Sequence, residues 1–250
     1  MPGTLYLIPN TLGPADVDQA DPLAGIIPIE VQAITSRLDY FVAENAKTTR
    51  AFLKLIALKY PLAKPLQQID IAELNVNTAA TALPALLEPL LAGRDAGLIS
   101  EAGVPAVADP GANLVRLAHS KGVMVRPLVG PSSLLLAVMA SGLNGQSFAF
   151  NGYLPVDPAQ RAKRIKDLEE RSRQDKQTQL FIETPYRNAP LLDTLVNSCR
   201  AETMICVATD LTLASEAVRT QTAGKWKREL KAGKMPDFNK KPSVFLLLAD

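Results

Sequence analysis

The sequence predicts an α/β protein of two lobes, each built on a mostly parallel sheet. Short apolar runs alternate with amphipathic segments along nearly the whole chain, and this β-loop-α-β order pairs parallel strands beneath covering helices. Proline and glycine at 127–130 interrupt the order near the middle. We therefore expect an N-terminal lobe at residues 1–127 and a C-terminal lobe at residues 128–250. With 250 residues, 47% of them hydrophobic, the chain is long enough to bury a substantial core.

In the N-terminal lobe, apolar runs bounded by turn residues predict strands, and apolar positions three or four residues apart predict helices. The segment 47–59 is helical by this criterion, since Phe52, Leu53 and Ile56 share one face. Strands are expected at 3–10, 40–44, 97–102 and 123–129. Helices are expected in four places: from residue 31 up to the strand at 40–44, at 47–59, from residue 78 to its end at Gly93, and at 112–122.

The C-terminal lobe repeats this style without repeating the sequence. Its helix at 159–175 is highly charged, which is typical of a helix with one face in solvent. Strands are expected at 147–155, 178–185, 203–212 and 242–249, and helices at 133–142, 159–175 and 189–200.

Composition excludes several classes of protein. No apolar run approaches the roughly 20 residues of a membrane span, and the amino terminus lacks the features of a signal peptide, so we expect a cytoplasmic protein without a membrane partner. The two cysteines, Cys199 and Cys206, lie far from the single histidine, His119, and no zinc-ligand spacing results. We expect no metal site and two core thiols. A net charge of +2 is too small to indicate a polyanionic partner by itself.

Two loops rich in glycine and proline, 100–111 and 129–133, follow apolar strands. Ligands of parallel sheets bind beyond the carboxyl ends of the strands, although such loops are also ordinary tight turns. Neither loop carries a dinucleotide or P-loop glycine pattern. A serine hydrolase is not favoured, because Leu134 stands where the G-x-S-x-G pattern of a nucleophile elbow needs its second glycine, and the single histidine, His119, is expected at a helix end.

Four segments, in order, carry a resemblance to a known family: "ISEAGVPAVADPG", "VGPSS", "SGLNGQSFAFNGYLP" and "FIETPYRN". Together they resemble the tetrapyrrole methylase superfamily of S-adenosylmethionine-dependent methyltransferases, and most closely its ribosomal RNA small-subunit 2′-O-ribose methyltransferase I branch. The resemblance implies two α/β lobes with the S-adenosylmethionine cleft between them, commonly in a homodimer.

The resemblance also implies which residues contact the cofactor. A site of this kind holds its zwitterionic ligand mainly with backbone groups and apolar contacts, which explains the absence of a charged fingerprint. The implied cofactor-binding residues are Pro9, Gly103, Pro105, Val107, Ser132, Ser133, Glu183, Thr212, Pro242 and Ser243.

Departures from the family pattern bear on the methyl acceptor. The ribosomal RNA enzymes usually have a segment resembling "AEDTRHTR", and the corresponding segment of this chain is "AENAKTTR". Glu44 and Arg50 are retained, while Asn45 replaces an aspartate. Basic residues of the family pattern are also absent at Thr209, Leu213 and Ser215. Fewer cations weaken the inference to ribosomal RNA, because phosphate contacts supply much of its affinity. A catalytically inactive S-adenosylmethionine-binding homologue, or a methyltransferase for a tetrapyrrole or other small molecule, therefore stays open.

Methyl transfer to a hydroxyl requires that its proton be taken up, and a carboxylate can accept it. Four carboxylates lie on segments expected to face the cleft, Glu44, Glu101, Asp109 and Glu183, and Glu44 and Glu101 are the catalytic candidates. Each of the four is equally suited to cap a helix or to brace a loop, and Asp109 is well placed to cap the helix that follows it.

Two basic segments are candidates for RNA contact. Segment 161–176 contains seven Lys or Arg against four Asp or Glu, and 225–234 surrounds Trp226, an aromatic residue of the kind that can stack on an unpaired base. The favoured alternative is a solvated, charge-mixed helix for the first segment and an exposed loop for the second.

Overall fold

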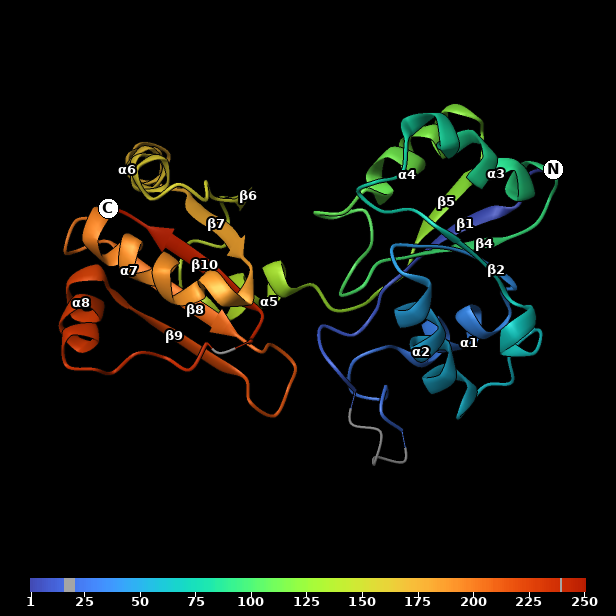
Figure 1. Cartoon of the computed structure of the whole chain (residues 1–250), viewed down its shortest axis with the longest axis horizontal. Coiled ribbons are helices and arrows are strands. Elements are labelled where there is room, and N and C mark those ends of the chain that lie inside the picture. The colour runs from blue at the N-terminus through green and yellow to red at the C-terminus, as the bar shows by residue number, and fades with distance from the viewer. Residues whose placement is uncertain (16–20, 239) are drawn as a thin grey trace. The chain divides into compact units, whose positions relative to one another are not determined.

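The computed structural model describes residues 1–15, 21–238 and 240–250, and it divides into two compact units, Met1–Ser132 and Ser133–Asp250 (Figure 1). The boundary lies inside the segment 129–133, a little beyond the position expected from the proline and glycine cluster. None of the helices in the described ranges combines the length and apolar content that a membrane span requires.

The first unit is built on a five-stranded, wholly parallel sheet in the order β3-β2-β4-β1-β5. Its strands are β1 (Thr4–Ile8), β2 (Tyr40–Ala43), β3 (Asp70–Glu73), β4 (Ala96–Ile99) and β5 (Met124–Pro127). Its helices are α1 (Ile29–Ser36), α2 (Ala46–Ala57), α3 (Leu83–Leu91) and α4 (Gly111–Ser120), with short 3-10 turns η1 (Leu66–Gln68) and η2 (Ala80–Ala82).

Alternating side chains of this sheet enter two separate cores. Phe41 packs with α1 and α2 residues such as Val31, Leu53 and Ile56. On the opposite face Val42 joins the cluster that holds residues of α3 and α4. This is the arrangement expected for a parallel sheet with both faces covered, and it places α2 and α4 on opposite faces.

The second unit also has a five-stranded sheet, in the order β6-β7-β10-β8-β9, but only β6 and β7 pair in parallel. Its strands are β6 (Phe148–Tyr153), β7 (Thr178–Glu183), β8 (Met204–Thr209), β9 (Ala217–Thr222) and β10 (Ser243–Leu248). Its helices are α5 (Ser133–Ser141), α6 (Pro158–Asp175), α7 (Asn188–Ser198) and α8 (Ala223–Lys231), with the 3-10 turn η3 (Pro185–Arg187).

The expectation of a mostly parallel sheet is confirmed in the first unit and wrong in the second. The connection from β8 to β9 covers only residues 210–216, which is too short for the crossover of a dozen or more residues that parallel pairing requires. An antiparallel pair forms instead, with Thr209 opposite Ala217 and Met204 opposite Thr222.

Helices α6, α7 and α8 share one core of the second unit, whereas α5 contacts β8, β9 and β10. In that core the side chain of Trp226 is fully buried, and its indole N–H donates to the carbonyl of Ile205 at 3.0 Å. Trp226 therefore does not offer its ring for stacking on an RNA base, because the ring lies in the protein interior.

Candidate functional site

The loop 100–111 of the first unit is joined to the end of β1 by hydrogen bonds. The Asn10 side-chain amide donates to the carbonyls of Ser100 and Glu101, each at 3.1 Å. The backbone of Asn10 donates to the carbonyl of Gly103 at 2.9 Å, and the Gly103 N–H donates to the carbonyl of Thr11 at 3.3 Å. The loop is thus fixed to the neighbouring strand at the carboxyl edge of the sheet.

Asp109 braces the same loop from within. One carboxylate oxygen accepts the N–H of Ala106 at 2.8 Å and the other accepts the N–H of Gly111 at 2.7 Å. Burial raises the pKa of Asp109, against the lowering effect of these two hydrogen bonds. Ala106 and Ala108 both adopt positive φ, at 64° and 61°, a conformation that costs non-glycine residues energy and that this bracing sustains. The loop-bracing interpretation of Asp109 is confirmed.

Two of the predicted cofactor-binding positions, Pro9 and Gly103, lie at this edge together with the segment 129–133. A Cβ placed on Gly130 would come within 2.1 Å of the Pro9 side chain, so the backbone at Gly130 lies directly against Pro9. A Cβ on Gly103, which has φ +68°, would come within 3.3 Å of the carbonyl of Pro131. Pro9, Gly103 and the start of the segment 129–133 therefore form one surface.

The remaining loop positions differ in exposure. Pro105 is buried and lines a small cavity of about 10 Å³ together with Glu44 and Asp109. Val107 is 47% exposed, which leaves its apolar side chain open to a ligand.

The two catalytic candidates are brought together. Glu44 follows β2, Glu101 follows β4, and these strands are neighbours in the sheet. The backbone N–H of Glu101 donates to the carboxylate of Glu44 at 3.1 Å. The Glu101 side chain is exposed, and its carboxylate makes no hydrogen bond or ion pair within the described ranges. The Glu44 side chain thus lies against the loop 100–111, which itself carries Glu101.

In the second unit, Glu183 ends β7 and its side chain is fully buried. One oxygen, Oε1, accepts the N–H of Thr184 at 2.7 Å and a guanidinium N–H of Arg187 at 2.6 Å. The pKa of Arg187 is raised by this hydrogen bond. Oε2, the other oxygen, has no hydrogen-bond partner among the described residues.

Ser243 begins β10 opposite Glu183 on one side and Thr209 on the other. Its hydroxyl lies 3.1 Å from that of Thr209 and 3.2 Å from the Asn188 amide nitrogen. Asp210 donates its N–H to the carbonyl of Pro242 at 3.0 Å, which ties the loop after β8 to the start of β10.

Thr212 lies in that loop with φ 74°, and its N–H donates to the Glu216 carboxylate at 2.7 Å. Within the described part of the chain, four buried side-chain atoms lack any hydrogen-bond partner, and all belong to this end of the second unit: Glu183 Oε2, Arg187 Nε, Asn188 Oδ1 and Thr212 Oγ1. Native proteins rarely leave such atoms unpaired, so their concentration here indicates a ligand site. Asn188 and Arg187 were not among the predicted site residues, although both lie in the segment "FIETPYRN".

The segment 129–133 crosses the boundary between the units. Ser132 is the last residue of the first unit and Ser133 opens α5 in the second. Within each unit the structure brings the predicted residues together: Pro9, Gly103, Pro105 and the two glutamates in one, Glu183, Thr212, Pro242 and Ser243 in the other.

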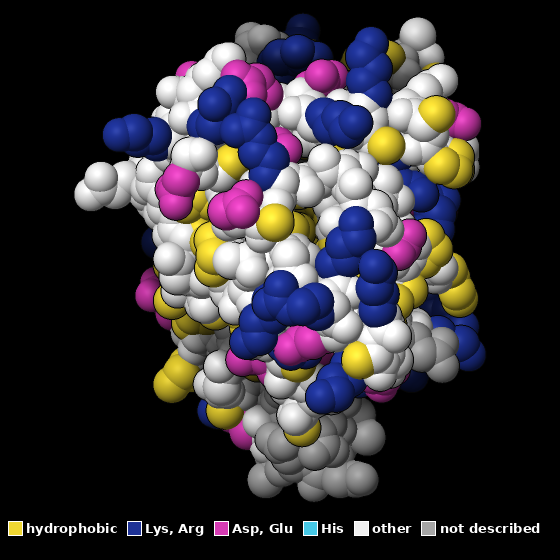
Figure 2. Space-filling view, turned by 90° about the vertical axis from the view of Figure 1, so that its left-hand side faces the viewer, with side chains coloured by type: hydrophobic (Ala, Val, Ile, Leu, Met, Phe, Trp, Pro, Cys, Tyr) yellow, Lys and Arg dark blue, Asp and Glu magenta, His cyan; other side chains and the backbone are white. Residues whose placement is uncertain are grey.

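The two basic segments form surface helices of the second unit. Figure 2 shows Lys and Arg side chains spread over the face it presents, with Asp and Glu among them. On α6, Arg171 pairs with Asp175 and Arg173 with Glu170. The α8 acid, Glu229, pairs with Arg219, which also lies 4.8 Å from the Trp226 ring. Among the described residues, no group of three or more His, Cys, Asp or Glu side chains could hold a metal ion.

Comparison with known sequences finds relatives that share one name. The chain is 30% identical over 217 residues to "Ribosomal RNA small subunit methyltransferase I" of Xylella fastidiosa, covering 87% of this chain and 71% of the relative. It is 31% identical over 224 residues to the protein of the same name from Mesorhizobium japonicum, covering 89% and 72%. No family model matches the chain.

Solved structures share the fold. The methyltransferase CobJ superposes with a TM-score of 0.61 over 99% of this chain and 94% of its own, at 16% identity. Cobalt precorrin-4 methyltransferase superposes with a TM-score of 0.57 over 98% of this chain and 94% of its own, also at 16% identity. The expected tetrapyrrole methylase-like architecture of two α/β lobes is confirmed.

Proposed function

The chain belongs to the ribosomal RNA small subunit methyltransferase I family, and from this premise we propose that it transfers the methyl group of S-adenosylmethionine to a ribose 2′-hydroxyl of small-subunit ribosomal RNA. The observation that carries the proposal is the pair of carboxylates, Glu44 and Glu101, at the edge where Pro9, Gly103 and Gly130 meet. A carboxylate beside the cofactor loop can take up the proton that a hydroxyl loses on methylation.

The residues present fit S-adenosylmethionine. In the first unit, Pro9, Gly103, Pro105 and Val107 offer backbone groups and apolar surface, and Ser132 follows them. In the second unit, Glu183 and Thr212 each have a buried oxygen without a partner among the described residues, which suits a ligand with ammonium, hydroxyl and amino donors. Ser133, Pro242 and Ser243 complete the proposed contacts.

Bound S-adenosylmethionine supplies a methyl carbon on a positive sulfur, whose departure as a neutral thioether needs no acid. The chain's own task is to align the hydroxyl and to take its proton. Glu44 is held by the Glu101 N–H, so its carboxylate is oriented, whereas the Glu101 carboxylate is unconstrained by hydrogen bonds in the described ranges. Either can receive the proton as the new carbon–oxygen bond forms.

We further propose a homodimer in the cytoplasm, where small-subunit ribosomal RNA is available. The homodimer is supported by Leu135 and Met139 on α5, which lie one helical turn apart and are 53% and 78% exposed. Adjacent exposed apolar side chains are common at interfaces between subunits.

The test uses small ribosomal subunits from a strain that lacks the gene. The purified protein and radiolabelled S-adenosylmethionine are added, and the labelled nucleotide is mapped by its resistance to alkaline hydrolysis, which 2′-O-methylation confers. Label in one ribose of the small-subunit RNA is the expected result. Cofactor binding without label in RNA would favour the inactive homologue, and label in a tetrapyrrole instead would favour the small-molecule enzyme.

A further inference from the structure

Helix α2 of the first unit carries an uninterrupted basic stripe. Lys47, Arg50 and Lys54 are all exposed, and their i, i+3, i+7 spacing places them on one face of the helix, opposite the buried Phe52 and Ile56. The helix itself contains no Asp or Glu.

The three charges are not neutralised locally. None of Lys47, Arg50 and Lys54 has an ion-pair partner among the described residues, and Arg50 reaches only the carbonyl of Ala46, at 3.5 Å. The nearby lysines differ, because Lys59 pairs with Asp21 and Lys64 pairs with Asp39. Unpaired cations of one helix face repel one another and attract a polyanion.

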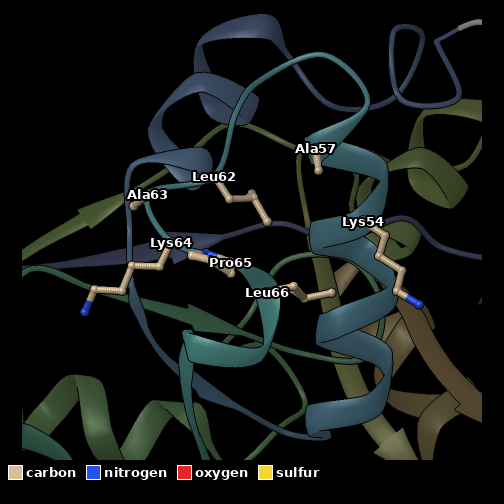
Figure 3. Close-up of a pocket in the computed structure, with 7 residues that line it drawn as sticks. All are labelled: Lys54, Ala57, Leu62, Ala63, Lys64, Pro65 and Leu66. Carbon is tan, nitrogen blue, oxygen red and sulfur yellow. The ribbon is translucent and has the colours of Figure 1, made fainter.

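A groove continues the stripe at its carboxyl end. It has a volume of about 460 Å³ and is lined by Lys54 and Ala57 of α2 and by residues 62–66 of the following segment. Figure 3 shows Leu62, Pro65 and Leu66 between the two lysines, Lys54 on the helix and Lys64 across the groove. An apolar floor beside one unpaired cation, Lys54, suits a nucleobase whose phosphate stays outside.

The other end of the stripe leads to the reacting edge. The α2 helix begins at its cap residue Asn45, immediately after Glu44, and Glu44 accepts the N–H of Glu101. Lys54 and Lys47 are separated by about 10 Å along the helix axis. With the added reach of their long side chains, the three basic residues can contact several successive nucleotides. The groove therefore lies at the carboxyl end of α2, the basic stripe runs along the helix, and the two carboxylates lie at its amino end, all within the first unit.

We propose that α2 binds the RNA strand that carries the methyl acceptor, with phosphates on Lys47, Arg50 and Lys54 and an unpaired base in the groove at Lys54. The inference rests on the proposed function and names the surface that its RNA substrate contacts. The basic helices of the second unit are the competing location. The α2 stripe is favoured because it is continuous with Glu44 and contains no acid, whereas α6 and α8 interleave acids with their cations.

The test compares two triple variants of the full chain. One is Lys47→Gln, Arg50→Gln and Lys54→Gln, which keeps good helix formers on an exposed face. The matched control is Arg116→Gln, Lys121→Gln and Arg126→Gln, which removes the same charge from exposed positions of the same unit, on and after α4. Binding of a fluorescein-labelled, unstructured 15-nucleotide RNA is measured by polarisation over a series of salt concentrations.

The α2 variant should bind at least tenfold more weakly at about 0.15 M salt, with the slope of log K against log salt reduced by roughly 2, since each lost phosphate contact contributes about 0.7. The control should lie within about threefold of the parent, a generic effect of charge. Melting temperature and affinity for S-adenosylmethionine should stay at parental values in both variants.

Equal losses in the two variants, or parental affinity in the α2 variant, would overturn the proposal, as would a parent that does not bind the RNA. So would a loss seen only on replacing Lys227, Arg228 and Lys231 of α8. The outcome is separable from that of the proposed function: RNA binding through α2 without methyl transfer would contradict only the function, and methyl transfer without α2 dependence would contradict only this inference.

Discussion

Gly103 is required by the protein itself before any ligand is considered. Its φ of +68° lies in the left-handed region, and a Cβ would meet the Leu12 side chain at 3.0 Å and the Pro131 carbonyl at 3.3 Å. The family resemblance implies that Gly103 contacts the cofactor, and the structure gives a separate reason for a glycine within the first unit. The two reasons make different predictions for stability and for binding.

We expect Gly103→Ala to lower the free energy of unfolding by about 1–2 kcal/mol, the typical cost of a left-handed L-residue, and to weaken S-adenosylmethionine binding as well. Gly122→Ala is the matched control, because Gly122 has the same φ of +68° and open space where the Cβ would lie. Calorimetric binding and melting temperatures separate the two effects. If both variants bound the cofactor like the parent, the loop 100–111 would be only a structural turn.

The two glutamates can be distinguished by substitution. Glu44→Gln keeps an oxygen that can accept the Glu101 N–H while losing the negative charge, so the fold should be unaffected. If Glu44 receives the proton, the single-turnover rate of methyl transfer should fall by about 10²–10⁴, the usual contribution of a general base. Glu101→Gln is measured beside it, on the same RNA.

A large loss in only one variant assigns the role to that residue. Rates within a few-fold of the parent in both variants would mean that the proton leaves to solvent and that the carboxylates only shape the edge.

At the scale of elements, one ion-pair network ties together the beginnings of three neighbouring strands. Arg94, just before β4, donates to Asp39 at 2.7 Å and lies 2.7 Å from Asp70, the first residue of β3. Asp39 stands just before β2 and also pairs with Lys64. The hydrogen bond from Arg94 lowers the pKa of Asp39 below its ordinary value of 3.8.

A carboxyl group whose pKa is lower in the folded state than in the unfolded state stabilises the fold at pH values above its unfolded-state pKa. This stabilisation is lost as the pH falls through the folded-state pKa. Asp39→Asn should therefore lower the stability of the first unit by about 1 kcal/mol near neutral pH. The difference from the parent should shrink as the pH falls below 3.8 and vanish below the lowered pKa of folded Asp39. Urea unfolding at several pH values measures it. Asp21→Asn, which removes an exposed pair with Lys59, should have the smaller effect. A difference between Asp39→Asn and parent that persists in acid would place the effect in packing.

Elements with strong apolar periodicity were predictable, and polar ones were not. The segments 111–120 and 178–183 stand within a few residues of their expected bounds, because their buried positions repeat at the helical or strand period. Strand β9 was missed since "AVRTQT" is an edge strand with few buried positions. Helix α8 was missed because its Lys and Arg residues suggested a loop, while Ala223 and Trp226 supply its buried face.

The candidate site was predictable only through the family resemblance. Backbone donors, carbonyls and small residues such as Gly103 and Pro105 have no spacing rule of their own. The unpaired oxygens of Glu183 and Thr212 depend on burial, which no single-sequence pattern reports.

At the scale of the whole molecule, the homodimer is the remaining expectation to test. Light scattering of the parent should give twice the mass of one chain across the micromolar range. Met139→Lys places a charge on the exposed apolar turn of α5 and should shift the mass toward the monomer with little change in melting temperature. Gln160→Lys, on α6, makes the same one-unit charge change at an exposed polar position. A parent that stays monomeric on concentration would refute the expectation.

The chain holds a single tryptophan and two cysteines, and all three lie in the second unit. Because Trp226 is fully buried, its emission should shift to the red only when that unit opens. Burial raises the pKa of both thiols, so reagents that need the thiolate should label Cys199 and Cys206 slowly until the same event. Circular dichroism reports on both units at once. Comparing the optical signals would therefore show whether the two units melt as one cooperative body or in sequence, and which of them a bound ligand protects.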